Sequence, residues 1–151
     1  MSFLSTLNIS GSGMTAQQTR LDVISENIAN MNTTRTEAGG AYRRKIVTMQ
    51  AQDGRNDFRA AMARAQRVAN TGYTTTGGVK ITNITEDQSD LKLVYDPMHP
   101  DANENGYVEL PNVDMVQEMA DAMAASQAFS ANVTVFNTLK GVIAKGLEIG
   151  R

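Results

Sequence analysis

The chain has 151 residues, of which 41% are hydrophobic, 20% are charged and 5% are aromatic. This length allows one ordinary domain and argues against a two-domain enzyme, and eight aromatic residues without a Trp predict a thin core that partners complete. A net charge of −2 gives no general attraction to nucleic acid or anionic lipid, and the lack of Cys excludes disulfides, thiolate nucleophiles and cysteine metal sites.

The N-terminal segment predicts an amphipathic helix over residues 12–31. Gly11 to Gly13 favour a flexible lead-in, and the polar residues from Asn30 to Thr34 favour its end. Apolar residues recur with the heptad spacing of a coiled-coil seam: Leu7, Met14, Leu21 and Ile28, with Ile24 and Met31 between them. The seam fits either a helix packed in its own domain or a surface that also meets helices of other molecules.

The first 19 residues carry no charged side chain, and polar residues interrupt them too often for a signal peptide. If the protein is exported, we expect a route other than a classical signal.

The middle of the chain changes from helical to alternating periodicity. Short strands are predicted at residues 42–50, 79–84 and 91–95, and a marginal helix at residues 57–68. Gly106 follows polar turn residues that include Asn105, and we expect it to take a positive φ so that Tyr107 and Val108 re-enter the β region. Pro111 then precedes the last helix.

The C-terminal segment predicts one long helix over residues 113–148. Apolar residues keep helical spacing over almost forty positions without Pro: Val116, Met119, Met123, Phe129, Phe136, Leu139, Val142, Ile143 and Ile149. The longer helix cannot bury its whole stripe against the shorter one, because a helix rises only 1.5 Å per residue.

The predicted fold is therefore mainly α with a small β insertion. Its N- and C-terminal helices pack as a coiled-coil-like pair in one helical domain. The expected segments are an N-terminal helix in 1–34, a β-rich insertion in 35–112 with a flexible arm at 51–78, and a C-terminal helix in 113–151.

Two motifs suggest ligands, and each has a simpler interpretation. Residues 11–16 fit the GxGxxA pattern of dinucleotide-binding loops, but no βαβ context surrounds them, which favours a helix lead-in. Residues 101–106 match the first half of a calcium loop, but position 12 of that loop is Asn112, which favours a turn closed by Asx side chains. His99 is the single histidine, so a catalytic or zinc site is not expected.

Charge is unevenly distributed along the chain. The net charge is −1 over residues 1–34, +5 over residues 35–67 and −6 over residues 68–151. This pattern indicates either head-to-tail attraction between copies or a basic loop that faces acidic neighbours of its own chain.

Several strings resemble flagellar axial proteins. The helix end Ser25-Glu26-Asn27-Ile28-Ala29-Asn30, followed by Tyr42-Arg43-Arg44, resembles the N-terminal signature of that superfamily. The ordered strings in the second half resemble the bacterial flagellar basal-body proximal rod proteins of the C type: residues 94–101, 105–108, 111–114 and 131–138. Residues 51–78 match no pattern of the family.

The resemblance implies a structural rod subunit without enzymatic activity, cofactor, metal, nucleic acid or small-molecule substrate. It implies export in an unfolded state by the flagellar type III apparatus, and polymerisation through the terminal helices. The implied partners are copies of the chain, other rod subunits, the export apparatus and the inner-membrane ring. The protein is then expected in the cytoplasm before export and in the basal body, within the cell envelope, afterwards.

We expect the assembly interface to comprise Leu7, Met14, Leu21, Ile24, Asn27, Ile28, Asn30, Met31, Val116, Met119, Met123, Phe129, Asn132, Phe136, Leu139 and Ile143. Asn27 and Asn30 are expected to fix register by bonding to neighbouring chains, although Asn30 also fits local helix capping. Two other functions stay open: a cytoplasmic helical adaptor or export chaperone, and a calcium-regulated or hydrolytic loop protein using Asp101, Asn103, Asn105 and His99.

Overall fold

The computed structural model describes residues 3–37, 39–52 and 77–149. The chain forms two compact units that each combine pieces of the terminal helices and of the central region. Unit 1 contains Met1–Gln18, Met49–Thr82 and Gln127–Arg151, and unit 2 contains Thr19–Thr48 and Asn83–Ser126. The helix predicted at residues 57–68 and most of the arm predicted at 51–78 lie outside the described residues.

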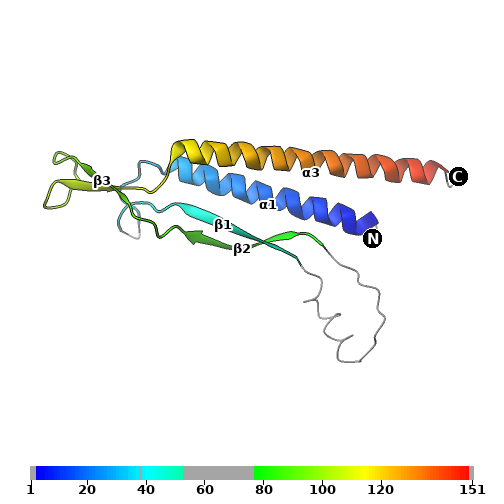
Figure 1. Cartoon of the computed structure of the whole chain (residues 1–151), viewed down its shortest axis with the longest axis horizontal. Coiled ribbons are helices and arrows are strands. Elements are labelled where there is room, and N and C mark those ends of the chain that lie inside the picture. The colour runs from blue at the N-terminus through cyan, green and yellow to red at the C-terminus, as the bar shows by residue number, and fades with distance from the viewer. Residues whose placement is uncertain (1–2, 38, 53–76, 150–151) are drawn as a thin grey trace, which may run out of the picture. The chain divides into compact units, whose positions relative to one another are not determined.

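Helix α1 spans Phe3–Ala29 (Figure 1). The predicted start at residue 12 is wrong, because the helix runs through Gly11 and Gly13 without a break. Two contacts hold this stretch: the Ser12 hydroxyl donates to Ile9 O at 2.8 Å, and the backbone N–H of Val79 donates to Ser12 Oγ at 3.1 Å. The helix ends where the Asn30 side chain donates to Glu26 O at 3.0 Å, close to the predicted end.

Helix α3 spans Met115–Ile149, which agrees with the predicted helix within two residues. Asp114 caps its start, because its Oδ1 accepts the backbone N–H of Val116 at 2.9 Å. Pro111 is fully buried just before this cap. The confirmed fold class is mainly α with a small β insertion.

The central region forms two sheets of two strands each. β1 (Lys45–Ala51) pairs with β2 (Val79–Glu86), and β3 (Lys92–Tyr95) pairs with β4 (Tyr107–Leu110). The hydrogen bonds from Gln52 N to Gly78 O and from Asp87 N to Arg44 O, each 2.7 Å long, show that β1 and β2 are antiparallel. Tyr42 and Arg44 were predicted in the first strand but precede it.

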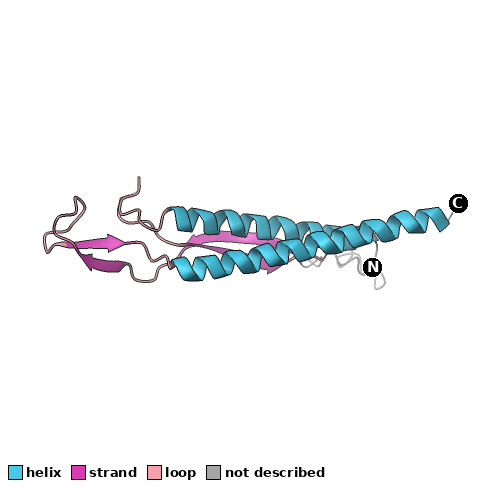
Figure 2. Cartoon of the chain, turned by 90° about the horizontal axis from the view of Figure 1, so that it is seen from above, coloured by secondary structure: helices cyan, strands magenta, loops and turns pink. Residues whose placement is uncertain are grey.

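Segments of the two helices lie side by side and antiparallel in each unit (Figures 1 and 2). In unit 1, a Cβ atom at Gly13 would lie 3.0 Å from Asn132 Nδ2, so the absence of a side chain there permits a close approach of α1 and α3. In unit 2, Arg20 Nη2 donates to Asp121 Oδ1 at 2.8 Å. Within the described residues, no helix is long and apolar enough to span a membrane.

Among the residues that the structure describes, few are buried in either unit. In unit 2 the buried apolar side chains are Val23, Ile24, Tyr42, Val108, Val113 and Ala125. In the described part of unit 1, Ala16 and the hydroxyl residue Ser10 are buried. Two of the largest fully buried side chains, Glu118 and Asn27, are polar, so polar contacts occupy the position that large apolar residues usually take in a domain core.

Candidate functional site

A buried polar cluster joins α1, the segment before β1, and α3 within unit 2. At its centre is Asn27, with 1% of its surface exposed. Its Nδ2 donates to Lys45 O at 3.0 Å and to Glu118 Oε2 at 3.1 Å. Its Oδ1 accepts the Tyr42 hydroxyl and the Lys45 backbone N–H, both at 2.9 Å. Asn27 therefore uses both amide donors and both carbonyl lone pairs.

The charge of Glu118 is balanced within the same cluster. Its side chain is completely buried, and its Oε1 accepts Arg44 Nε at 2.5 Å. The same guanidinium reaches Asp121 Oδ2 at 3.4 Å, and Arg20 contacts the other oxygen of Asp121. A buried carboxylate without a partner would be very costly, so Arg44 is required wherever Glu118 is ionised.

Tyr42 lies at the edge of this cluster with its ring buried. Burial raises the pKa of the Tyr42 hydroxyl to about 12, and the nearby carboxylates of Glu26, Glu118 and Glu86 add to the effect. Both causes disfavour the phenolate, so the hydroxyl remains a donor to Asn27 over the whole physiological range.

The basic segment 43–45 faces acidic residues of its own chain, as one of the two interpretations of the charge pattern expected. Arg44 pairs with Glu118 and Asp121, and Lys45 Nζ pairs with Glu26. The Arg43 guanidinium donates to Asp87 O and Ser89 O, each at 3.3 Å.

Asn27 and Ile24 were expected at an interface between molecules, and that role stays a prediction. Each is buried within its own chain, and every hydrogen-bond partner of the Asn27 amide belongs to the same unit. Asn30 also bonds locally, because its Nδ2 donates to Glu26 O and its Oδ1 accepts the Thr33 hydroxyl at 3.1 Å. The Asn27 and Asn30 side chains therefore form hydrogen bonds within the subunit at the end of α1.

The apolar stripe expected along α3 divides into two faces. Val116, Met119 and Met123 are exposed by 78%, 48% and 62% and share one side of the helix. Glu118 and Ala125 are buried on the opposite side. Five residues expected in the interface continue the buried side and are half-buried: Phe129, Asn132, Phe136, Leu139 and Ile143.

On α1, the predicted seam lies beside the most buried face. Ala16, Val23 and Asn27 are buried. The remaining seam residues, Leu7, Met14, Leu21 and Ile28, are half-buried, as is Met31 after the helix end. The seam residues therefore retain apolar surface that another molecule can cover.

The loop from residue 96 to residue 106 is an Asx-closed turn. Asn103 Oδ1 accepts the backbone N–H groups of Asn105 at 3.0 Å and Tyr107 at 2.9 Å, and Gly106 has a φ of 81°, as predicted. Asp101 Oδ2 accepts the Thr34 hydroxyl at 2.8 Å. In the described parts of the chain no group of three or more His, Asp or Glu could hold a metal ion.

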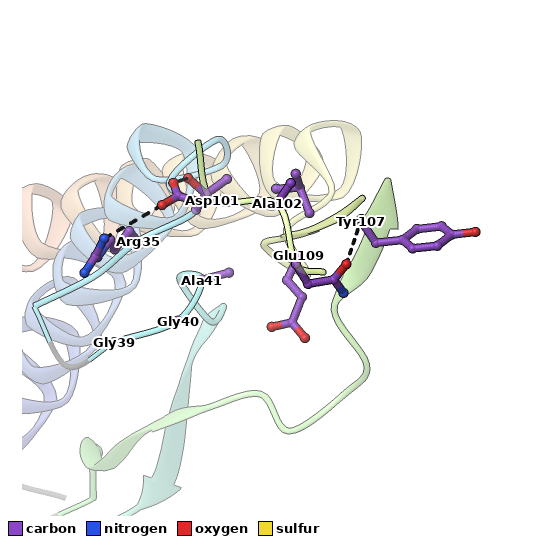
Figure 3. Close-up of a pocket in the computed structure, with 11 residues that line it drawn as sticks. Arg35, Gly39, Gly40, Ala41, Asp101, Ala102, Tyr107 and Glu109 are labelled. Atoms are coloured by element: carbon purple, nitrogen blue, oxygen red, sulfur yellow. Dashed lines mark hydrogen bonds and ion pairs between the residues drawn. The ribbon is translucent and has the colours of Figure 1, made fainter. Parts of the chain in front are cut away.

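An open cavity of about 440 Å³ lies between this loop, β4 and residues 34–35 and 39–41 (Figure 3). Arg35 and Asp101 face each other across it, 4.0 Å apart, whereas the Tyr107 ring points away from it. The polar lining of the cavity is Thr34, Arg35, Asp101, Asn103, Tyr107 and Glu109.

Sequence reasoning did not single out Glu118, Arg44 or Tyr42 as cluster members. The available signal was the position of Glu118, seven residues before Ala125 and thus on the same side of α3. A charge at a core position requires a buried partner of opposite charge, and the basic string Arg43-Arg44-Lys45 was one candidate.

Comparison with known proteins identifies the family. Residues 7–35 match a family model described as flagella basal body rod protein, and residues 104–149 match one described as flagellar basal body rod FlgEFG protein C-terminal. The chain is 44% identical to the flagellar basal-body rod protein FlgC of Bacillus subtilis, over 100% of both chains. It is 40% identical to FlgC of Borreliella burgdorferi, over 99% of this chain and 98% of the relative, and 39% identical to FlgC of Salmonella typhimurium, over 100% of both. With this identity over the full length, the chain belongs to the FlgC family of flagellar basal-body rod proteins.

Proposed function

We propose that the chain is a structural subunit of the flagellar basal-body rod and that it catalyses no reaction. Family membership supports this role, and one structural observation supports a way of performing it: the uncovered apolar face of α3 formed by Val116, Met119 and Met123. An isolated soluble protein gains nothing from exposing such a face, whereas a subunit of a larger assembly can bury it.

The two sides of α3 have different tasks in this proposal. The buried side, where Glu118 accepts a hydrogen bond from Asn27 of α1 and pairs with Arg44, holds α3 against α1 within one subunit. The exposed side contacts neighbouring molecules, and full burial of a Val or Met side chain contributes about 1.5–3 kcal/mol. The half-buried seam of α1 adds a second apolar surface.

The finer features of this role are also proposals. The subunit is exported unfolded through the flagellar type III apparatus and then joins the rod in the cell envelope. Its neighbours are copies of itself, other rod subunits and the inner-membrane ring at the rod base. The family resemblance supports each of these statements, and the apolar surfaces of both helices suit a chain that completes its packing after export.

The test is Met123→Asp, with Ala124→Asp as the matched control. Both positions are exposed, so both variants keep the fold of the subunit, but only Met123 belongs to the apolar face. We expect purified basal bodies to lack the Met123→Asp chain and to contain the Ala124→Asp chain at the wild-type amount. Normal incorporation and motility of the Met123→Asp strain would contradict the use of this face.

A further inference from the structure

The hairpin of β3 and β4 leaves one of its two faces uncovered. In its register Leu93 lies opposite Glu109, and Tyr95 lies opposite Tyr107, so these four side chains share one face. Leu93 and Tyr95 are 64% and 65% exposed. We call this surface the hairpin face.

The hairpin face is preformed. The Tyr95 and Tyr107 rings make an edge-to-face contact with centroids 5.3 Å apart, and the Asn103 side chain holds the turn that precedes β4. An isolated two-stranded hairpin is marginally stable and gains most from packing against a helix. An apolar and uncovered sheet face therefore suits a helix of a second molecule.

The negative charge of the hairpin indicates which kind of helix can bind to its face. Residues 90–110 carry five acidic side chains and one basic side chain, a net charge of −4. Glu109 lies on the hairpin face itself. A partner surface that is apolar and basic is attracted to this face, whereas an acidic one is repelled.

Helix α3 offers two uncovered apolar faces, and their charges differ. The face with Val116, Met119 and Met123 lies in a stretch that includes Asp114 and Asp121 and has no basic residue. The other lies toward the helix end, where the spacing places Val135, Thr138, Val142 and Lys145 on one side. All four are exposed, and residues 127–147 contain two lysines and no acid. We call this second surface the lysine face.

We propose that the hairpin face of one copy docks on the lysine face of a second copy. This contact rests on the proposed role as a rod subunit, because it requires copies to meet in an assembly. Two different surfaces of the same chain form a heterologous contact, which repeats from copy to copy and produces an open helical array or a ring. Leu93, Tyr95 and Tyr107 then pack on Val135 and Val142, with Glu109 near Lys145.

The test uses a photoreactive benzoylphenylalanine at position 95 in cells that assemble rods. Because Tyr95 is mostly exposed, the probe fits without a change in the fold. After irradiation we expect a covalent dimer of the chain in purified basal bodies, with the adduct mapped by mass spectrometry to residues 135–147 of the second copy. The matched control carries the probe at the exposed Glu104, away from the hairpin face, and should not give this adduct.

Charge reversal supplies an independent readout. Lys145→Glu should lower the yield of the dimer several-fold, and Glu109→Lys added to Lys145→Glu should restore it. Three results would overturn the contact and leave the rod function intact. These are an adduct to another rod protein, an adduct within the same chain, and no adduct although the chain is in the basal body. Absence of the wild-type chain from purified basal bodies would overturn the rod function itself.

Discussion

Glu118 carries a charge with no exposed surface, and its nearest positive charge comes from Arg44. Removing one member of a buried ion pair leaves the other desolvated, and this typically costs about 3–5 kcal/mol. Asp121 is a useful comparison because it belongs to the same cluster but its side chain is 30% exposed. The two carboxylates have similar chemistry and differ mainly in their access to water.

We expect Glu118→Ala to lower the free energy of unfolding by about 3–5 kcal/mol and Asp121→Ala by about 1 kcal/mol or less. Urea unfolding of both variants, followed by circular dichroism, measures the difference. Equal losses would show that water reaches Glu118 as freely as it reaches Asp121.

Tyr42 predicts a pH dependence at the alkaline end. Its folded-state pKa of about 12 lies above the ordinary value of 10. The unfolded chain therefore releases this proton first, and the stabilisation is fully present below pH 10 and is lost as the pH rises toward 12. A tyrosinate absorbance titration of wild type and of Tyr42→Phe isolates this hydroxyl. A Tyr42 midpoint near 10 would contradict its burial among carboxylates.

At the scale of the elements, the two glycines within α1 have different surroundings. Glycine costs about 1 kcal/mol relative to Ala in a helix interior, so the sequence considered alone favours a start near residue 12 and not a helix that runs through both glycines. In the structure Gly13 lies against the Asn132 side chain, whereas nothing lies within 4 Å of a Cβ atom at Gly11. The two glycines therefore differ in a way that local sequence does not reveal.

We expect Gly11→Ala to stabilise the protein by about 1 kcal/mol, because it adds helix propensity in open space. Gly13→Ala should gain less, since its Cβ lies 3.0 Å from Asn132 Nδ2. Thermal unfolding of both variants, and of Gly13→Ala combined with Asn132→Ala, gives the coupling between the two positions. If Gly13→Ala gains as much as Gly11→Ala alone, the two helices do not approach closely there.

The sequence predicted those elements whose signals are local. The long helix of residues 113–148 and the strand of 79–84 follow from periodicity, and the positive φ of Gly106 follows from the turn residues before it. It did not predict that Val116 and Phe129 lie on different sides of α3. Both residues are apolar, and the buried side at the helix start is occupied by Glu118, which hydropathy assigns to solvent.

At the scale of the whole molecule, burial is unevenly spread over the helices. In unit 2, Val23, Asn27, Glu118 and Ala125 are buried. In unit 1, the stretch 140–148 of α3 is exposed except for the half-buried Ile143. Regions with few buried contacts open with little free energy, so the two parts of α3 should differ in stability when no neighbour is present.

Hydrogen exchange measures this difference. In the isolated subunit we expect stronger protection at residues 118–125 than at residues 140–148, and in assembled rods we expect protection at 140–148 to rise toward that of the first part. Uniform protection along α3 of the isolated subunit would indicate that its end is stable without neighbours.

The Asn27 amide uses all of its hydrogen-bond donors and acceptors, and this restricts which other side chains position 27 tolerates. Leu has the same branching, but its methyl groups are bulkier, and it would leave the Lys45 carbonyl and the Glu118 carboxylate without their shared donor. Asp matches its shape, but would bring a second carboxylate against Glu118 and offer no donor to either group. Gln carries the same amide on a side chain longer by one methylene in a fully packed space. Position 27 thus distinguishes even isosteric side chains, and deamidation of Asn27 to Asp would disrupt the same hydrogen bonds as an Asn27→Asp mutation.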